Sequence, residues 1–524
     1  MVRGPASSTA RTRIHRRMFP SHAGAVAILA TAAVLVASLA GCVPPVRDPG
    51  ARGDDDAARE RGAVVPARRP NLLFVLIDDL GYADFSATGG HAVATPNIDR
   101  LAGDGLLMTR FYVAAPICSA SRAGFMTGRF PARDGFVSFI DGRRHNIQMG
   151  QADWLDPSLP TLPRALQRAG YATGHFGKWH LGGGRDVGEA PLPAAYGFDE
   201  SYTQFEGLGP RVLMTEDHYG LASKSARLGQ GPIDRLPKSQ ITARYIDKLL
   251  DFVARAGDRP WFAQLWLDDV HDPYSPSTAQ LEAVAGKGRS EDERRFLATL
   301  VAMDAQIGRL ADALARSGEL DDTLLVIAGD NGPTAAAHYY HGGGAPPGDA
   351  GPYRGRKGSL YEGGIREPLI VRWPGQVPAG RRDGTTIAGA VDLFPTLAAI
   401  AGAPPPPRGD GIDLQAAWRG APIARRPPLL WAYGDFGEKV PLPALARDRS
   451  LPYAIRSGRW KLFARGDGRD AALYDLDADP GETRDLAASR PDVAGPLAAR
   501  IAAWRATLPA RGWRSAEAGG AHVH

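Results

Sequence analysis

Three short apolar runs in this chain are each followed by carboxylate or amide side chains, and this repeated arrangement constrains the fold most. The runs cover residues 71–77, 261–267 and 324–328, and aspartate or asparagine follows each within a few positions. A nearly uninterrupted apolar run of this length is typical of a strand buried on both faces of a parallel sheet. Ligands of open α/β sheets bind beyond the carboxyl ends of the strands. The polar residues after the runs are therefore candidates for one shared site.

Segments between these runs carry apolar residues at helical spacing. The spacing is clearest in residues 239–256, and residues 161–169 and 291–317 predict two further helices. Strands that alternate with helices predict an α/β sandwich with a mainly parallel central sheet flanked by helices.

The composition changes at four consecutive prolines, residues 404–407, which predict a surface connection. Short segments rich in apolar and aromatic residues follow at 453–456, 460–463 and 472–476 and predict an antiparallel sheet. A last helix is expected at 492–508, with its start delayed by the Gly-Pro pair at 495–496. We therefore divide the folded part into a large domain, residues 70–405, and a small C-terminal subdomain, residues 406–524.

The first 41 residues have the pattern of a targeting segment. Arginines at positions 11–17 precede a run of 18 mostly small apolar residues, and the segment ends in Leu-Ala-Gly before Cys42. This ending resembles the lipobox of bacterial lipoproteins, which implies cleavage before Cys42 and lipid attachment to that residue. A plain secretory signal or a permanent single-pass anchor is the alternative, because the run is just long enough to span a bilayer. Residues 42–69 have no apolar period and predict a disordered tether.

The formal net charge of +5 does not indicate a nucleic-acid partner. Five of the 62 basic residues and none of the 57 acidic residues lie within residues 1–41, so the remainder is formally neutral. The chain has only two cysteines, Cys42 and Cys118, which excludes a disulfide scaffold and a cysteine-built zinc site.

Cys118 lies in the densest motif, which runs from Pro116 to Arg129. A lone cysteine is ordinarily a small buried hydrophobe, and a thiol nucleophile needs a nearby base. The stretch resembles the sulfatase motif Cys-x-Pro/Ala-x-Arg followed by Thr-Gly-Arg, in which the cysteine is converted to formylglycine. Ala120 stands where the commonest form has proline, and Ser119, a rival nucleophile in principle, is not at the family position. The resemblance extends over nearly all of residues 71–490 through further motifs at 78–79, 95–99, 177–182, 271–273, 329–332, 357–364 and 473–482.

This resemblance implies a formylglycine-dependent sulfatase of the arylsulfatase branch, with the alkaline-phosphatase-like fold. The reaction would convert a sulfate ester and water to an alcohol or phenol and inorganic sulfate, with a sulfated small molecule or glycan as substrate. A thiol would leave a stable thiosulfate, whereas the second hydroxyl of an aldehyde hydrate can expel sulfate. The resemblance also implies a formylglycine-generating or sulfatase-maturating enzyme as a partner.

Four side chains that follow two of the apolar runs offer oxygen ligands only: Asp78, Asp79, Asp330 and Asn331. This set suits Ca²⁺, or Mg²⁺, rather than zinc, and the resemblance adds Cys118 as the modified ligand. If only one such pair were present, the simpler interpretation would be that its acids end a strand and cap a turn. Adjacent residues on a strand point to opposite faces, so the chain must leave strand geometry at 78–79 for both acids to share a metal.

Five further residues are candidates for the chemistry. Lys178 and His180 lie two apart, so on an extended segment they face the same side. The resemblance implies that Lys178 holds a sulfate oxygen and the hydrated aldehyde, and that His180 is the base in sulfate release. It implies that His271 and Lys357 bind the sulfate and the leaving oxygen, one of them donating a proton. It implies that Arg122 fixes the formylglycine hydroxyl and the local charge.

Two other functions remain open from the sequence. One is a formylglycine-dependent phosphomonoester or phosphonate hydrolase, because phosphate and sulfate esters have similar shapes. The other is an inactive surface lipoprotein that binds sulfated glycans without conversion of Cys118. The segments expected to select the substrate are residues 183–238, 335–353 and 432–450. The chain is expected to be exported and held at the bacterial cell envelope by lipid on Cys42.

Overall fold

The computed structural model describes residues 69–340, 345–433 and 443–509, which belong to one compact unit. The predicted signal segment, Cys42 and nearly all of the predicted tether lie outside the described residues. Within those ranges, each helix is too short or too polar to cross a lipid bilayer.

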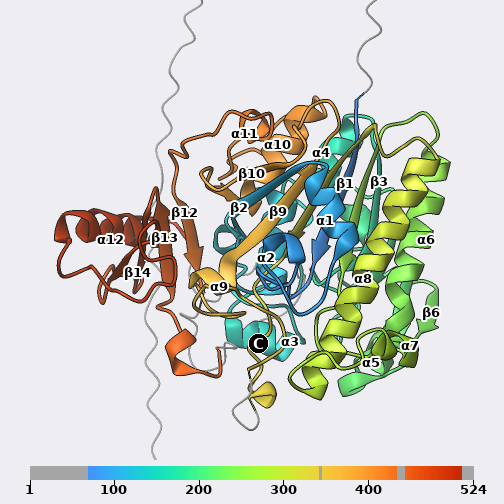
Figure 1. Ribbon diagram of the computed structural model, residues 1–524, viewed down its shortest axis with the longest axis horizontal. Helices are drawn as coiled ribbons and strands as arrows, with labels where there is room; N and C mark the ends of the chain where they lie inside the picture. Colours follow the sequence, from blue (N-terminus) through green and yellow to red (C-terminus); the bar gives the residue numbers. More distant parts are fainter. Residues whose placement is uncertain (1–68, 341–344, 434–442, 510–524) are drawn as a thin grey trace, which may run out of the picture. The chain divides into compact units, whose positions relative to one another are not determined.

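A mixed, mostly parallel sheet of 11 strands forms the centre of the described fold (Figure 1). Its order is β10-β2-β9-β8-β1-β7-β3-β4-β5-β6, with β11 paired to β2. Strand β9 runs antiparallel to both of its neighbours, β2 and β8. The bounds are β1 Asn71–Ile77, β2 Leu106–Tyr112, β3 Ala172–Lys178, β4 Glu200–Gln204, β5 Arg211–Met214, β6 Ile233–Leu236, β7 Trp261–Leu267, β8 Thr323–Gly329, β9 Arg366–Arg372, β10 Arg381–Asp383 and β11 Ala388–Gly389.

Strand β1 shows why an uninterrupted apolar run predicts a strand at the middle of the sheet. Its side chains alternate between two hydrophobic cores: those of 72, 74 and 76 enter one core, and those of 73, 75 and 77 enter the other. The strand pairs in parallel with β7 on one side and β8 on the other. The three runs noted in the sequence are therefore adjacent strands, and their carboxyl ends meet at one edge.

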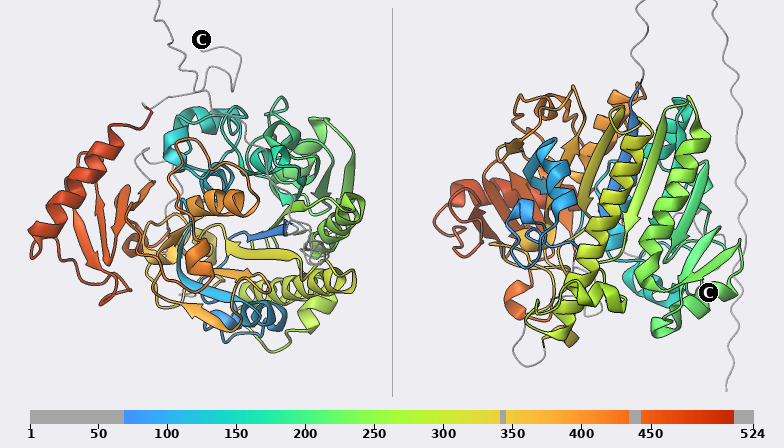
Figure 2. Two further views of the ribbon diagram at one scale, coloured as in Figure 1. Left: turned by 90° about the horizontal axis from the view of Figure 1, so that it is seen from above. Right: turned by 45° about the vertical axis from the view of Figure 1, so that its right-hand side comes forward.

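Helices cover both faces of the sheet (Figure 2). Helices α1, α6 and α8 contribute to one core, and α2, α4 and α10 contribute to the other. The predicted helices α4, α6 and α8 begin and end within one residue of their expected bounds. The bounds are α1 Pro96–Gly103, α2 Cys118–Thr127, α3 Arg143–Met149, α4 Leu162–Arg168, α5 Leu221–Arg227, α6 Lys238–Ala256, α7 Thr278–Glu282, α8 Glu291–Arg316, α9 Glu362–Ile365, α10 Leu393–Ile400 and α11 Gln415–Trp418.

Helix α8 illustrates how local sequence starts an element. The Ser290 side chain accepts a hydrogen bond from the backbone N–H of Glu293, and three acidic residues occupy the first turn. Both features stabilise a helix N-terminus, the first by satisfying a free N–H and the second by opposing the helix dipole.

A separate antiparallel sheet of four strands follows near the C-terminus, in the order β12-β13-β14-β15. Its bounds are β12 Leu429–Ala432, β13 Tyr453–Ser457, β14 Trp460–Ala464 and β15 Ala472–Asp475, and helix α12 Pro491–Arg505 packs on it. The expectation that Gly495 and Pro496 delay this helix was wrong, because α12 begins at Pro491 and contains Pro496. Buried Leu497, Ile501 and Trp504 outweigh the one hydrogen bond that proline forgoes. The antiparallel sheet is confirmed, and the domain boundary at 405/406 stays a prediction.

Candidate active site

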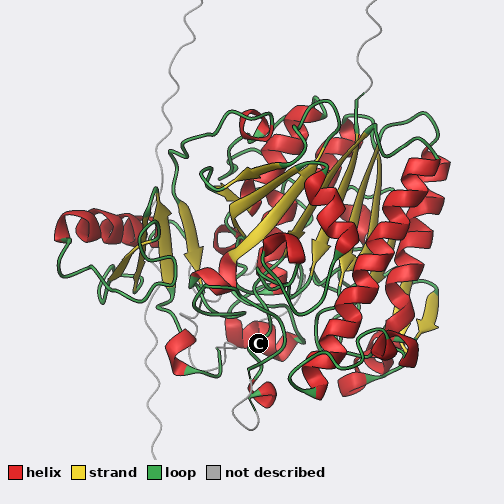
Figure 3. Cartoon of the chain, in the orientation of Figure 1, coloured by secondary structure: helices red, strands yellow, loops and turns green. Residues whose placement is uncertain are grey.

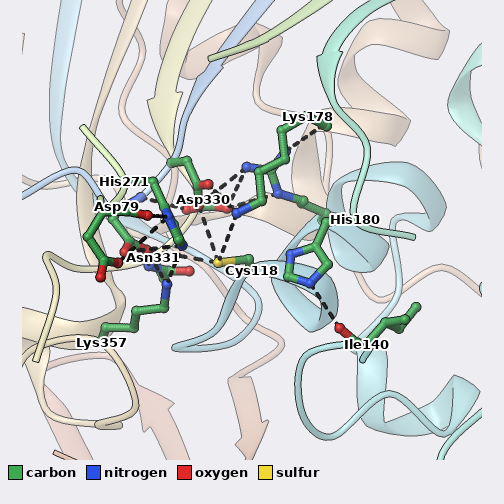
Figure 4. A network of polar contacts seen from close by, with 12 residues as sticks. Asp79, Cys118, Ile140, Lys178, His180, His271, Asp330, Asn331 and Lys357 are labelled. Atoms are coloured by element: carbon green, nitrogen blue, oxygen red, sulfur yellow. Dashed lines mark hydrogen bonds and ion pairs between the residues drawn. The ribbon is translucent and has the colours of Figure 1, made fainter. Parts of the chain in front are cut away.

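The candidate residues lie together at the carboxyl edge of the central strands (Figure 4). Figure 3 shows loops beyond the ends of these strands. Asp78 follows β1, Lys178 ends β3, His271 follows β7, and Asp330 follows β8. Cys118 is the first residue of α2 and lies among them. The structure thus brings together all of the predicted site residues: Asp78, Asp79, Cys118, Arg122, Lys178, His180, His271, Asp330, Asn331 and Lys357.

The two adjacent acids after β1 turn into the same site because the chain leaves extended geometry there. Asp79 has a φ of 56°, in the left-handed region, and its backbone N–H donates to Asp330 Oδ1 at 3.2 Å. Gly81 is required just beyond, since a Cβ atom at that position would lie 2.5 Å from the carbonyl oxygen of Asp349.

The Cys118 thiol is buried against these acids. It donates to Asp78 Oδ1 at 3.2 Å, and its sulfur lies 3.9 Å from Asp79 Oδ1 and 3.9 Å from Lys178 Nζ. Burial, and then the charge of Asp78, raise the pKa of the thiol well above its ordinary value. A protonated thiol is a poor nucleophile, so ordinary thiolate catalysis does not fit this position.

Arg122 is fully buried and joins two carboxylates below Cys118. Its Nε lies 3.0 Å from Asp330 Oδ2, and its Nη2 lies 2.8 Å from the same oxygen and 3.5 Å from Asp78 Oδ1. Its Nη1 donates to the backbone carbonyl of Lys178 at 3.0 Å. Burial alone would raise the pKa of Asp78, but Lys178, His271 and Arg122 together hold that pKa well below its usual range.

The donor set fits a hard divalent cation. Asp79 Oδ2 and Asn331 Oδ1 are buried and have no hydrogen-bond partner among the described residues. Burial and the charge of Asp78 raise the pKa of Asp330 to about 8, which a divalent cation beside these carboxylates would reverse. Ligand atoms of Asp78, Asp79, Cys118 and His271 all lie within 4.8 Å of one another. The sequence had not placed His271 in this group, and Ca²⁺ or Mg²⁺ would select the oxygens over its ring nitrogen.

Lys357 and His271 form a pair on the cavity side of the acids. Lys357 Nζ lies 2.6 Å from Asp79 Oδ1 and 3.3 Å from His271 Nε2. The other ring nitrogen, Nδ1, lies 2.6 Å from the carbonyl oxygen of Asp272, a contact that requires a proton on Nδ1. Burial, and then Lys178, lower the pKa of His271. The ring is therefore neutral at pH 7, and its Nε2 accepts from Lys357.

His180 lies on the opposite side of Cys118. Its Nε2 donates to the carbonyl oxygen of Ile140 at 3.1 Å, while its buried Nδ1 has no hydrogen-bond partner among the described residues. Burial, and then Lys178, lower the pKa of His180 well below its ordinary value. The neutral ring thus presents a free proton acceptor beside Cys118.

A cavity of about 270 Å³ opens above these groups. Segment 183–238, expected to select the substrate, supplies much of its wall. The sequence did not assign a role to any of the eight residues that it contributes: Arg185, Gln204, Phe205, Met214, His218, Tyr219, Leu221 and Lys238. Their spacing along the chain is irregular, so no sequence pattern marks them. In the second segment expected to select the substrate, residues 335–353, the side chain of His338 is 52% exposed and lies outside this cavity. Much of the third segment, residues 434–442, lies outside the described residues.

Comparison with known proteins identifies related chains. The sulfatase family model matches residues 70–403, and the model of the C-terminal part of N-sulphoglucosamine sulphohydrolase matches residues 351–503. Human arylsulfatase A is 32% identical over 463 residues, which cover 80% of this chain and 84% of that protein. Canine N-acetylgalactosamine-6-sulfatase is 32% identical over 71% of this chain and 70% of its own.

Solved structures share the fold. The crystal structure of Ps i-CgsB in complex with a neocarrahexaose has a TM-score of 0.70 and 26% identity, and covers 85% of this chain and 94% of its own. The phosphonate monoester hydrolase of Agrobacterium radiobacter has a TM-score of 0.58 and 23% identity, and covers 84% of this chain and 96% of its own. At that identity the second likeness concerns the fold alone.

Proposed function

Because the chain belongs to the sulfatase family and is a sulfuric ester hydrolase, we propose that it cleaves carbohydrate or aryl sulfates with a formylglycine at position 118 beside bound Ca²⁺. The main support is the position of Cys118, whose protonated thiol lies between the acidic cluster and the basic residues of the cavity. The names of the relatives, an arylsulfatase and a sugar sulfatase, support both kinds of leaving group.

The proposed cation and the proposed formylglycine would each supply one part of the chemistry. When bound, Ca²⁺ or Mg²⁺ would offset the charge of the sulfuryl oxygens, and a hydrated aldehyde at position 118 would present an oxygen nucleophile to sulfur. Asp78, Asp79, Asp330 and Asn331 would hold the cation. Arg122 fixes two of these acids in place by its contacts with Asp330 and Asp78.

The basic residues of the cavity divide the proton transfers between its two sides. Lys178 Nζ, near residue 118, is placed to bind a sulfuryl oxygen. His180 Nδ1 is a free acceptor and takes the proton of the hydroxyl that expels sulfate. Lys357 Nζ, bonded to neutral His271, donates a proton to the leaving oxygen. The neutral imidazole stays hydrogen-bonded to the lysine and carries no charge of its own.

Matched substrates test this proposal against the two alternatives. We expect kcat/KM for 4-nitrophenyl sulfate to exceed that for 4-nitrophenyl phosphate, because the family and the named relatives are sulfatases. The same preparation should show formylglycine at residue 118 by peptide mass spectrometry. A preference for the phosphate would instead favour the phosphomonoester or phosphonate hydrolase. An unconverted Cys118 in protein matured in its host would favour the glycan-binding lipoprotein.

We also propose that Cys42 carries lipid and anchors the chain at the bacterial cell envelope, after a formylglycine-generating or sulfatase-maturating enzyme has acted on Cys118. The support is the ending before Cys42 and the motif around Cys118. The mature protein is then expected to partition into detergent and to contain no free thiol when denatured. One full equivalent of thiol on titration would show that one of the two cysteine assignments is wrong.

A further inference from the structure

The loop that carries Lys357 is defined here as the lysine segment, residues 354–364. On its inner side it is fastened to the main chain next to the site: Lys357 N–H donates to Pro333 O at 3.0 Å, and Gly358 N–H donates to Pro116 O at 2.8 Å. The two ends of the segment pack closely against each other at Gly363 and Gly364. A Cβ atom at these positions would lie 2.3 Å from Gly355 O and 2.1 Å from Ser359 O, so only glycine fits. The position of Lys357 therefore depends on how the whole segment is held.

The outer side of the lysine segment is held by the C-terminal part of the chain. The backbone N–H of Glu362 donates to Glu482 Oε2 at 2.6 Å, and the backbone N–H of Leu360 donates to Ser450 Oγ at 3.0 Å. The ring of Tyr361 lies 4.9 Å from the ring of Phe463 on β14. These contacts come from residues that play no part in the cavity.

A buried group of charges lies at the centre of this contact. Lys461 Nζ lies 2.9 Å from Glu362 Oε1 and 3.0 Å from Glu482 Oε1, and all three side chains are fully buried. Glu362 Oε2 accepts from the hydroxyl of Tyr112 at 2.6 Å and lies 3.2 Å from the guanidinium of Arg366. Buried ion groups of this kind add little stability relative to apolar side chains of similar volume. Their presence here calls for a reason other than stability.

The backbone at Glu482 supports a positional role. Glu482 has a φ of 53°, in the left-handed region that non-glycine residues rarely adopt. Strained conformations persist only where the surroundings enforce them, and they concentrate at functional sites. Glu482 is fully buried and touches both the backbone of Glu362 and the ammonium of Lys461.

We propose that Glu482 and Lys461 are positioning residues that hold Lys357 against the leaving oxygen, so that the C-terminal sheet is part of the catalytic apparatus. The proposal rests on the proposed role of Lys357 as the proton donor. Loss of this support would let Lys357 Nζ drift from Asp79 Oδ1 and His271 Nε2, now 2.6 and 3.3 Å away. Proton donation would then weaken while the metal ligands stay in place.

A series of phenyl sulfates with leaving groups of graded pKa provides the test. The variant Glu482→Leu removes the acceptor of the Glu362 N–H and leaves Lys461 paired with Glu362. We expect kcat/KM to fall roughly ten- to a hundredfold for phenyl sulfate but less than about threefold for 4-nitrophenyl sulfate. The leaving group of the nitrophenyl ester departs without a proton, so only mispositioned Lys357 produces this difference.

Two further variants keep the result interpretable. Asp392→Leu is the matched control, because Asp392 is also a buried acid that pairs with one cation, Arg425, and accepts backbone N–H groups. It should lower stability without changing the dependence on the leaving group. The double variant Lys461→Met/Glu482→Leu removes the buried pair together, and it should reproduce the steeper dependence if the single variant fails to fold.

The variant Lys357→Ala separates failure of this proposal from failure of the proposed function. If Lys357→Ala steepens the dependence on the leaving group and the folded Glu482 variants do not, the positioning role is wrong. If Lys357→Ala itself leaves the dependence unchanged, then Lys357 is not the proton donor and the proposed mechanism fails. An equal fall for all phenyl sulfates in the folded Glu482 variants would also contradict the positioning role.

Discussion

Replacing Cys118 by alanine is expected to lower kcat for 4-nitrophenyl sulfate by about 10⁴-fold or more. The variant has no side chain from which a formylglycine is made, so the site loses its nucleophile while the basic and acidic groups around it remain. Removing the nucleophile of a catalytic unit ordinarily costs as much as removing the unit. Steady-state rates of the purified variant, with its circular dichroism compared to that of the parent, measure the effect.

Ser119→Ala is the matched control for this variant. Ser119 is the neighbouring residue and also carries a nucleophilic oxygen. Its hydroxyl accepts a hydrogen bond from the backbone N–H of Ile140 at 2.9 Å. Its loss removes one buried hydrogen bond, so we expect a fall of less than about tenfold, through the contact of Ile140 with His180. If Ser119→Ala were inactive and Cys118→Ala active, the assignment of the nucleophile would be reversed.

Removal of the divalent cation is expected to lower kcat/KM by about 10³-fold. The charges of Asp78 and Asp79 would then face the sulfate without the cation that offsets them, and only the basic side chains of the cavity would oppose the sulfuryl oxygens. Dialysis against a chelator followed by titration with Ca²⁺ should restore the rate. Because Asp330 has a pKa raised to about 8, protons compete with the cation, so Ca²⁺ affinity should fall as the pH is lowered below about 8.

Thermal unfolding gives a readout of the same site that is independent of activity. Ca²⁺ at about 100 times its Kd should raise the free energy of unfolding by about 2.7 kcal/mol. The variant Asn331→Leu, which removes an unpartnered oxygen, should lose most of this gain. Unchanged unfolding with and without Ca²⁺, in a protein that keeps full activity after chelation, would refute the metal site.

The strand-end acids account for how well the site could be predicted from the sequence. Apart from Asn71, the runs at 71–77 and 324–328 are apolar because both faces of the sheet are covered. The polar residues that follow them must then emerge at the same edge. The family motifs added Lys178 at the end of β3, His271 after β7, and Lys357 in the loop between β8 and β9. The local sequence pattern and the sheet topology agree here, so the position of these site residues could be predicted from the sequence.

The residues that escaped prediction are those whose partners are distant in the chain. Glu362 and Glu482 are 120 positions apart, and neither residue type nor spacing pairs them before the fold is known. Phe205 reaches the cavity from the residue after β4, and Lys238 from the first position of α6, and no sequence period marks either position. Pro496 shows the opposite error. The rule that proline delays or interrupts a helix predicted a later start for α12, but the packing of Leu497 and Ile501 keeps the helix intact around Pro496.

The burial of Cys118 has a consequence for how the protein is made. Residues 118–122 are each 1% exposed or less, and they form the first turn of α2 beneath the cavity. If Cys118 is converted to formylglycine as proposed, the enzyme that converts it must reach a side chain that is buried in the folded protein, so it would act before α2 docks. On that proposal, conversion of Cys118 competes with folding, and molecules that fold first would keep their thiol. The specific activity of a preparation thus records the outcome of that race, and slower folding should raise it.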